Sequence, residues 1–339
     1  MTPREIEKLF ERRNIAEIVR RNKQVLSILE DAAKEIADRI RRYHIRHPKG
    51  GASFYAFNKQ IERNIDAALK VLAGDLEKSI RNGVTANWEL ANTKNNAFVK
   101  AFAAGSKVPG KIMHSMNLLN LDALSAFLDR KDFGLSLSDK VWKFTRNYKE
   151  QLEQLLATGI TEGENAFNIA KKVEKYIAGK PIKYAGGLLP KRNIAYQAVR
   201  LAATETNMAY RMSDYERRQK LPFVIGVEVV LSAAHPTFDI CDSMAGNYPK
   251  GFVFLGWHPR CICYTKVILQ SKSEFIDFIK TGHVDQRRYV RSIPQSAQAY
   301  LQRHRPTISK WKTKPFFLRD NFTEKFELRK DVLKIGRAS

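Results

Sequence analysis

Two stretches within residues 1–80 repeat apolar side chains every three or four positions, which places those side chains on one face of a helix. The first stretch opens with a capping pattern at Thr2, Pro3 and Glu5 and ends before Pro48. Its apolar positions are Val25, Leu29, Ala32, Ile36, Ile40 and Tyr43. The second stretch, residues 53–80, meets a stop signal at Asn82 and Gly83. Its apolar positions are Ile61, Ile65, Leu69, Leu72, Leu76 and Ile80. We predict two long helices packed as an antiparallel pair.

The helical pattern after residue 83 is shorter and more interrupted. Residues 84–131 contain breaks at NTKNN and GSKVPGK, which leave short helices at 88–103 and 121–128. An amphipathic helix starts at Ser138 and is expected to end at Gly159. Another follows within residues 164–178, and the longest helix of the second half is predicted over residues 191–221.

Residues 224–231 and 261–269 are strand-like runs, and the turn formers between them favour a loop held on a small sheet. The pairing should be mostly antiparallel, because too little chain separates the runs for a helical crossover. The predicted fold class is therefore α+β and predominantly α, with helix 191–221 packed on the sheet. We expect a helical region at 1–132, a compact domain at 133–270 and a basic extension at 271–339.

The charge balance narrows the classes of partner. The chain has 59 Lys and Arg against 35 Asp and Glu, a formal net charge of +24. A surplus of this size favours contact with a polyanion such as nucleic acid, because counterions released from the polyanion drive association. No run of 18 apolar residues occurs and the first residues are charged, so we expect neither a membrane span nor a signal peptide. The expected place of synthesis is a cytoplasm-like compartment.

All three cysteines lie in the loop and strand of the predicted compact domain. Cys261 and Cys263 share one face of an extended strand, and His258 and Cys241 could fold toward them to complete four zinc ligands. The spacing is not a standard zinc pattern, so buried apolar thiols, or a disulfide from Cys241, are the alternatives. No orienting acid accompanies His258 and Cys261, and we therefore expect no enzyme.

Two further features carry candidate residues. Glu205 lies in an apolar part of helix 191–221, where an acid usually pairs with a base such as Arg200 or Arg211. The extension mixes bases with aromatic residues, and Lys310, Lys312, Lys314 and Arg319 are its candidate DNA contacts. Such a segment could track a phosphate backbone while its rings stack on bases, lie as an arm across a partner subunit, or be a plain tail docked on the protein itself.

The sequence HPRCIC at His258, Pro259, Cys261 and Cys263 resembles the phage Mu F-like family of minor head proteins. Asp239 with Cys241, and AATET with Thr204 and Glu205, belong to the same resemblance, which covers residues 136–267. LSDKVWK at 137–143 and GITEGENAFNIAKKV at 159–173 are also similar to that family. The family usually has an Arg directly before the Thr-Glu pair, whereas this chain has Ala203.

The resemblance implies a component of a tailed-phage or prophage head, made in the host bacterial cytoplasm and placed inside the capsid near the portal. It implies roles in head assembly and in packaging or delivering DNA, with the portal protein, other head proteins and double-stranded DNA as partners and no membrane. It implies no catalytic activity. Two alternatives remain open: a zinc-stabilised DNA-binding protein, and a toxin-like enzyme that carries a Mu F-like domain.

Overall fold

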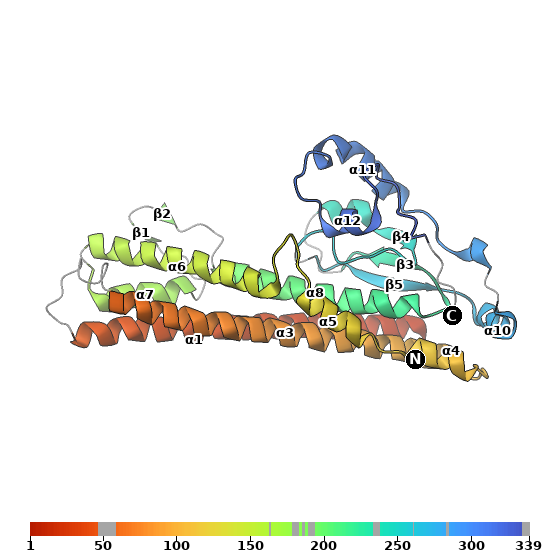
Figure 1. The fold of residues 1–339 in the computed structure, drawn as a ribbon, viewed down its shortest axis with the longest axis horizontal. Helices are drawn as coiled ribbons and strands as arrows, with labels where there is room; N and C mark the ends of the chain where they lie inside the picture. Colours follow the sequence, from red (N-terminus) through yellow and green to blue (C-terminus); the bar gives the residue numbers. More distant parts are fainter. Residues whose placement is uncertain are drawn as a thin grey trace. The chain divides into compact units, whose positions relative to one another are not determined.

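The computed structural model describes residues 1–46, 59–162, 164–177, 183–184, 187–188, 194–232, 238–259, 261–282 and 285–333. Helices dominate these residues (Figure 1). The helices are α1 (Pro3–Arg46), α3 (Lys59–Ala103), α4 (Gly110–Asn117), α5 (Leu121–Asp129), α6 (Leu137–Thr161), α7 (Ala166–Ile177), α8 (Ile194–Gln219), α9 (Ile240–Met244), α10 (Lys272–Thr281), η1 (Gln286–Arg288), α11 (Gln295–Ile308) and α12 (Phe316–Asn321). The strands are β1 (Lys183–Tyr184), β2 (Gly187–Leu188), β3 (Val224–Val230), β4 (Gly246–Pro249) and β5 (Tyr264–Leu269). The predicted fold class, α+β and mainly α, is confirmed.

The chain forms two compact units, and each is assembled from segments that are far apart in the sequence. Unit 1 contains residues 1–17, 84–128 and 204–339, and unit 2 contains residues 18–83 and 129–203. Helices α1, α3 and α8 each contribute residues to both units. The sequence analysis expected consecutive regions instead. The units are not consecutive because long helices such as α1, α3 and α8 begin in one unit and end in the other.

The described residues of unit 2 are mainly helical, with a two-residue antiparallel pair of β1 and β2 and an isolated bridge between Asp132 and Leu135. Its buried apolar side chains come from the predicted stripes of α1 and α3 and from α6 and α7. They include Val25, Leu29, Ile36, Ile40, Ile61, Ile65, Leu72, Val141, Tyr148, Leu152 and Val173. The ion pairs of Arg41 with Glu174, at 2.9 Å, and of Lys149 with Asp66, at 2.7 Å, join different helices within this unit.

Two predicted helix ends are wrong. Helix α3 runs without interruption through Asn82 and Gly83 to Ala103, so residues 88–103 are its last turns and not a separate helix. Helix α6 likewise passes Gly159 and ends at Thr161. An isolated glycine inside a helix costs only about 1 kcal/mol relative to alanine, and burial along the stripe outweighs that cost. The predicted starts at 53–58 and 191–193 lie outside the described residues.

Unit 1 contains a three-stranded antiparallel sheet in the order β4-β3-β5. Val227 lies opposite Tyr248 on β4 and Val267 on β5, which confirms the predicted pairing of residues 224–231 with 261–269. Helix α8 contacts this sheet: the Thr265 hydroxyl on β5 donates to the Asp214 carboxylate at 3.2 Å. The long helix therefore lies where the sequence pattern places it.

The basic extension is part of the unit 1 core. A cluster of buried side chains joins the sheet and the cysteine loop to α11, α12 and the segment after α12. It contains Val227, Val229, Cys241, Met244, Tyr248, Phe252, Phe254, Trp257, Cys261, Cys263, Ile293, Ala297, Leu301, Ile308, Phe317, Leu318, Phe322 and Val332. Phe317 and Phe322 are buried in this core, so their rings cannot stack on nucleic-acid bases, whereas Trp311 is 41% exposed.

A second part of unit 1 holds buried charge. Lys94 on α3 lies 2.7 Å from Asp214 on α8 and 3.6 Å from Glu7 on α1. Burial alone would raise the pKa of Asp214, but Lys94 and Arg218 hold it below its ordinary value. Glu7 also accepts a hydrogen bond at 3.0 Å from the backbone N–H of Val267, on the edge strand β5. The carboxylate thus satisfies a backbone donor that the sheet leaves unpaired.

Candidate metal centre

A short helix positions the first sulfur of the site. Asp239 caps α9: its side chain accepts from the N–H of Cys241 at 2.6 Å, and Asp242 closes the capping box by accepting from the N–H of Asp239 at 2.8 Å. The Cys241 side chain then enters the core cluster, where the residue is 1% exposed. The capping pattern therefore fixes the position of the thiol relative to the loop that carries His258.

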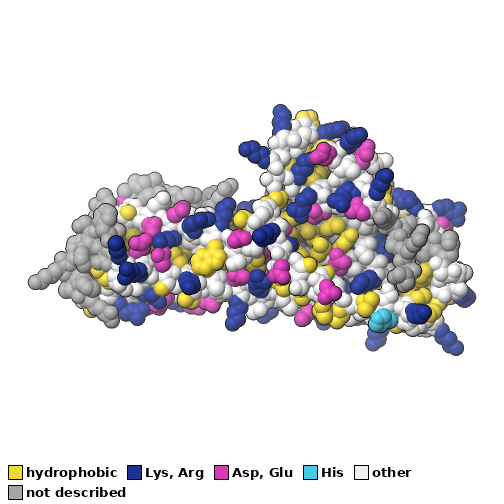
Figure 2. All heavy atoms as spheres, in the orientation of Figure 1, with side chains coloured by type: hydrophobic (Ala, Val, Ile, Leu, Met, Phe, Trp, Pro, Cys, Tyr) yellow, Lys and Arg dark blue, Asp and Glu magenta, His cyan; other side chains and the backbone are white. Residues whose placement is uncertain are grey.

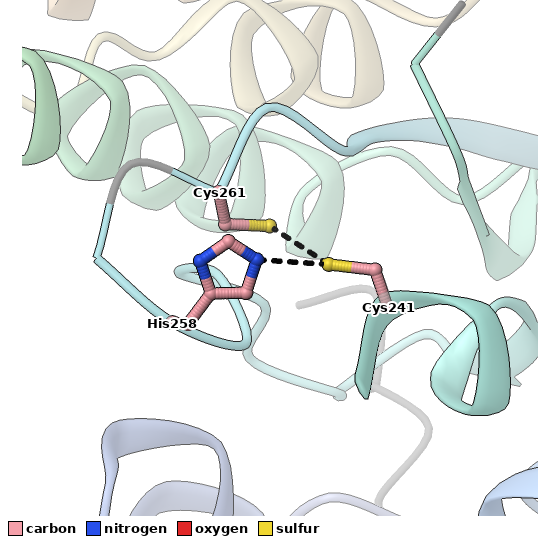
Figure 3. Close-up of side chains that lie close together, drawn as sticks. All are labelled: Cys241, His258 and Cys261. Carbon is pink, nitrogen blue, oxygen red and sulfur yellow. Dashed lines mark hydrogen bonds between the residues drawn. The ribbon is translucent and has the colours of Figure 1, made fainter. Parts of the chain in front are cut away.

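Three of the four predicted metal ligands converge (Figure 3). The Sγ of Cys241 lies 3.1 Å from Nε2 of His258 and 3.8 Å from Sγ of Cys261. The ligand atoms of Cys241, His258 and Cys261 all lie within 4.8 Å of one another. Among the described residues this is the group of His, Cys, Asp and Glu side chains that could hold a metal ion.

The imidazole is oriented for coordination through Nε2. Its Nδ1 lies 2.9 Å from the carbonyl oxygen of Pro259, so Nδ1 carries the proton and donates it to that carbonyl. The Nε2 lone pair is then left facing the two sulfurs. A ligating histidine commonly uses its other N–H in this way, because the hydrogen bond fixes both the tautomer and the ring direction.

The spacing of the two sulfurs matches a tetrahedral zinc site. With Zn–S bonds of about 2.3 Å, two sulfurs on one tetrahedral ion lie about 3.8 Å apart. Cys241 and Cys261 have this separation without any rearrangement. The geometry can therefore accept an ion between three side chains that come from α9, the loop and the start of the segment leading into β5.

Two side chains lie close to the fourth position. Cys263 is buried in the same cluster, and hydrogen bonding with Cys241 and Cys261 affects its thiol pKa, but its sulfur is not part of the three-residue group. An oxygen of Asp239 lies 3.3 Å from Nε2 of His258, and both side chains are more than one-third exposed. The site consequently has a buried sulfur side and a solvent-facing side.

The thiols differ in their acidity. Hydrogen bonds with Cys241 and then Cys263 hold the pKa of Cys261 well below its usual range, and the nearby Arg211 cation acts in the same direction. The pKa of Cys241 is raised, first by its hydrogen bonds with Cys261 and Cys263 and then by burial. One sulfur of the group thus favours the thiolate form, which is the form that binds metal.

Polar groups on helix α8 hold the backbone of the site, and sequence reasoning missed this role. Arg211 donates from Nη1 to the carbonyl of Leu255 at 2.7 Å, and from Nη2 to the carbonyls of Cys261, at 2.7 Å, and Cys263. The Asn207 amide donates to the same Cys261 carbonyl at 2.8 Å. The sequence indicates Arg211 only as a base near Glu205, whereas the structure shows its hydrogen bonds to these backbone oxygens.

A chain of asparagines extends this support through the core of unit 1. Asn87 on α3 donates to Asn14 on α1 at 2.8 Å, and Asn14 donates to Asn207 at 3.1 Å. All three residues are buried. A buried asparagine is costly unless its amide is satisfied, so asparagines at stripe positions of predicted helices are the signal that could have indicated this network.

The remaining candidate residues do not belong to the three-ligand group. On α8, Glu205 is buried and Thr204 is partly buried, and both precede Asn207 and Arg211 on the same helix. Lys310 and Lys312 are exposed and Lys314 is partly exposed after α11. Arg319 on α12 forms an ion pair with Asp320 at 2.8 Å and lies over the Phe316 ring, so part of its charge is already compensated.

No protein-family model matches the chain, and no curated protein or solved structure matches it. No described helix is both long enough and apolar enough to cross a membrane.

Proposed function

We propose that Cys241, His258 and Cys261 bind one zinc ion that stabilises the fold of unit 1. The observation that carries this proposal is the 3.8 Å separation of the two sulfurs, together with an imidazole whose Nε2 faces them. Zinc would cross-link α9 to the loop before β5, which are otherwise joined by the long segment 245–257. A structural role suits Cys241, because its side chain is buried in the core cluster of unit 1.

We further propose that the chain is a non-enzymatic minor head protein of a tailed phage or prophage, seated near the portal inside the capsid. The support is the resemblance around His258–Cys263 and the way the resembling residues meet. Asp239, Cys241, His258 and Cys261 surround one centre, and α8, which carries Thr204 and Glu205, supplies the hydrogen bonds that hold the centre's backbone. Motif residues far apart in sequence thus serve one local structure.

The third part of the proposal is that the protein binds double-stranded DNA without sequence preference. A net charge of +24 is its main support, and Figure 2 shows Lys and Arg side chains scattered over the described parts of one face. Scattered cations supply phosphate contacts but no base-reading element. Lys310, Lys312 and Lys314 make no ion pair among the described residues, so they are the strongest candidate contacts, with Arg319 beside them.

A gel-shift titration against salt tests DNA binding. If about five phosphates are contacted, raising salt from 50 to 200 mM should weaken binding by about 500-fold, equally for unrelated sequences. Replacing Lys310, Lys312, Lys314 and Arg319 by Ala should reduce both the affinity and the salt slope. The matched control replaces Lys70, Lys78, Lys100 and Lys111, which are exposed elsewhere, and changes the net charge equally. Equal losses in the two variants would remove the site assignment, and salt-insensitive binding would remove the DNA proposal.

Elemental analysis tests the zinc proposal independently of DNA. Protein purified without chelator should contain close to one equivalent of zinc, because a structural site of this kind is nearly filled. A content below about one-tenth of an equivalent would leave the cysteines as buried thiols. A full zinc site and salt-dependent DNA binding without any association with portal protein would instead favour a stand-alone DNA-binding protein.

A further inference from the structure

A pocket of about 520 Å³ opens beside α11, and none of the proposed metal ligands lines it. Its walls are the segment before α11, one face of α11 itself, and the turn after α12. The floor is apolar: Ile293, Leu301 and Phe322 belong to the buried core cluster and also line the pocket. Leu328 lines the pocket as well and is packed against that cluster. The pocket therefore gives a ligand direct access to the apolar core of unit 1.

The rim of the pocket is cationic. Arg291, Arg305 and Lys325 line it, all three are exposed, and none makes an ion pair with a described carboxylate. Other arginines of the same region do have such partners, for example Arg287 with Asp285 at 3.0 Å and Arg329 with Asp331 at 2.8 Å. Figure 2 shows Lys and Arg side chains next to hydrophobic ones over the part of the molecule formed by α11 and α12. The rim thus presents uncompensated positive charge around an apolar floor.

The turn that carries Lys325 is held in an unusual conformation. Phe326 has φ of 65°, a left-handed backbone conformation that residues other than glycine rarely adopt. Hydrogen bonds from Phe326 N–H to the Thr323 carbonyl, at 3.0 Å, and from Thr323 N–H to the Glu327 carbonyl, at 2.8 Å, maintain the turn. A bulky residue in this region costs of order 1 kcal/mol or more, and such conformations often occur at binding sites. The turn keeps Lys325 and Phe326 at the pocket wall.

We propose that this pocket binds an acidic segment of a partner protein, with one aliphatic or aromatic side chain inserted onto the floor and flanking carboxylates facing Arg291, Arg305 and Lys325. Among the described lining residues Glu327 is the one acid, so the rim that they form has a net positive charge complementary to such a segment. Nucleic acid suits the pocket less well. Phe322 is buried, and the guanidinium of Arg305 lies over the Phe326 ring with its centre 5.8 Å from the ring centroid, so neither ring offers a free face to a base.

Fluorescence anisotropy with the full-length protein tests this site, and the test does not depend on DNA or zinc binding. The probes are four labelled twelve-residue peptides of Asp, Glu and Ser, each with a central Leu, Ile, Phe or Trp, and a fifth peptide with Ser at the centre. At least one apolar peptide should bind, and the Ser peptide should bind about tenfold or more weakly, because it buries no apolar side chain. No binding of any peptide below about 1 mM overturns the proposal.

Charge reversal locates the binding. Arg305→Glu with Lys325→Glu should weaken the best peptide by about tenfold or more, because repulsion replaces attraction at the rim. Lys310→Glu with Lys312→Glu changes the net charge equally outside the pocket and should have much less effect. Leu333→Ser, at an exposed apolar residue that lines the pocket, should weaken the apolar peptide but not the Ser peptide. Equal effects of the two charge reversals, or equal binding of Ser and apolar peptides, would show general attraction to a basic surface. Loss of duplex DNA affinity in the Arg305 and Lys325 variant, with peptide binding unchanged, would assign the pocket to nucleic acid.

Discussion

The guanidinium of Arg211 donates a hydrogen bond from Nη2 to the carbonyl oxygen of Cys261 at 2.7 Å. This contact joins the middle of α8 to the backbone of a metal-ligand residue, and the same side chain also binds the carbonyls of Leu255 and Cys263. The cation is buried, so its hydrogen-bonding groups depend on these oxygens. The loop and the helix therefore stabilise each other.

Replacing Arg211 by Met should destabilise the protein by about 3 kcal/mol or more, because three buried carbonyls lose a charged donor. Urea unfolding followed by circular dichroism measures the change. The control is Arg303→Met on the exposed face of α11, which should change stability by no more than about 0.5 kcal/mol. Similar values for the two variants would contradict the role assigned to Arg211.

Gly256 should not tolerate a side chain. Its φ is +124°, and an added Cβ would lie 2.6 Å from Nη1 of Arg211 and 3.2 Å from Cβ of Cys261. Gly256→Ala should therefore lower the unfolding midpoint and reduce bound zinc, because the loop must shift. Gly74→Ala in α3 is the control, because nothing lies within 4 Å of its added Cβ. It should stabilise the protein by about 0.5–1 kcal/mol. Opposite signs for the two substitutions are expected in the same thermal scan.

His258→Ala should remove most of the bound zinc, because it deletes the nitrogen that faces both sulfurs. The unfolding midpoint of the unmodified protein should fall when a chelator is added, because zinc stabilises only the state that binds it. The variant should show no such response. His114→Ala, at an exposed position on α4, should keep both the zinc and the response. A chelator response that persists in His258→Ala would place the metal elsewhere.

Stability should rise with pH above neutrality through Lys250. Burial, and then the nearby Arg218 cation, lower the pKa of Lys250 to about 7 from an ordinary value of 10.5. Between these values the unfolded chain binds a proton that the folded chain lacks, so raising the pH favours folding by up to about 1.4 kcal/mol per pH unit. Lys250→Met should lose this contribution, although it also deletes a hydrogen bond to the Leu221 carbonyl. Urea unfolding at intervals from pH 6 to 10 gives the free energy of unfolding against pH for the unmodified protein and for Lys250→Met. Equal slopes for the two proteins would contradict the prediction.

The parts of the fold that the sequence predicts correctly are those where apolar spacing alone determines burial. The stripes of α1 and the first half of α3 and the pairing of β3 with β5 follow from such patterns, whereas the approach of Cys241, His258 and Cys261 was predicted from their residue types. Cys263 shares their cluster, but the three-residue group forms without it. The residue types and their spacing were sufficient to predict these three ligands.

The second half of α3 shows why the remaining elements were missed. The sequence pattern at Asn92, Lys94 and Asn95 indicates a break in the helix, but these residues are buried and contact partners from distant segments. Asn92 donates to Asn120, and Lys94 and Asn95 contact Asp214. A polar residue can be assigned to the buried face of a helix only when its partners are known. Here those partners are 25 or more positions away in the sequence. Docking of the extension through Phe317 and Phe322 was only one of its alternatives, because the net charge of the extension says nothing about its apolar face.

The ion pair of Lys94 with Asp214 and the hydrogen bond from Val267 to Glu7 have a consequence for folding during synthesis. Segments that are synthesised first need partners that are synthesised much later. For example, 260 positions separate Glu7 from Val267, whose N–H donates to the Glu7 carboxylate. Until Asp214 emerges, a compact arrangement of α1 and α3 would bury the Lys94 ammonium without its closest carboxylate, which is strongly unfavourable. Unit 1 should therefore reach its native packing only after most of the chain has left the ribosome, and the early helices are then the part most exposed to chaperones and proteases.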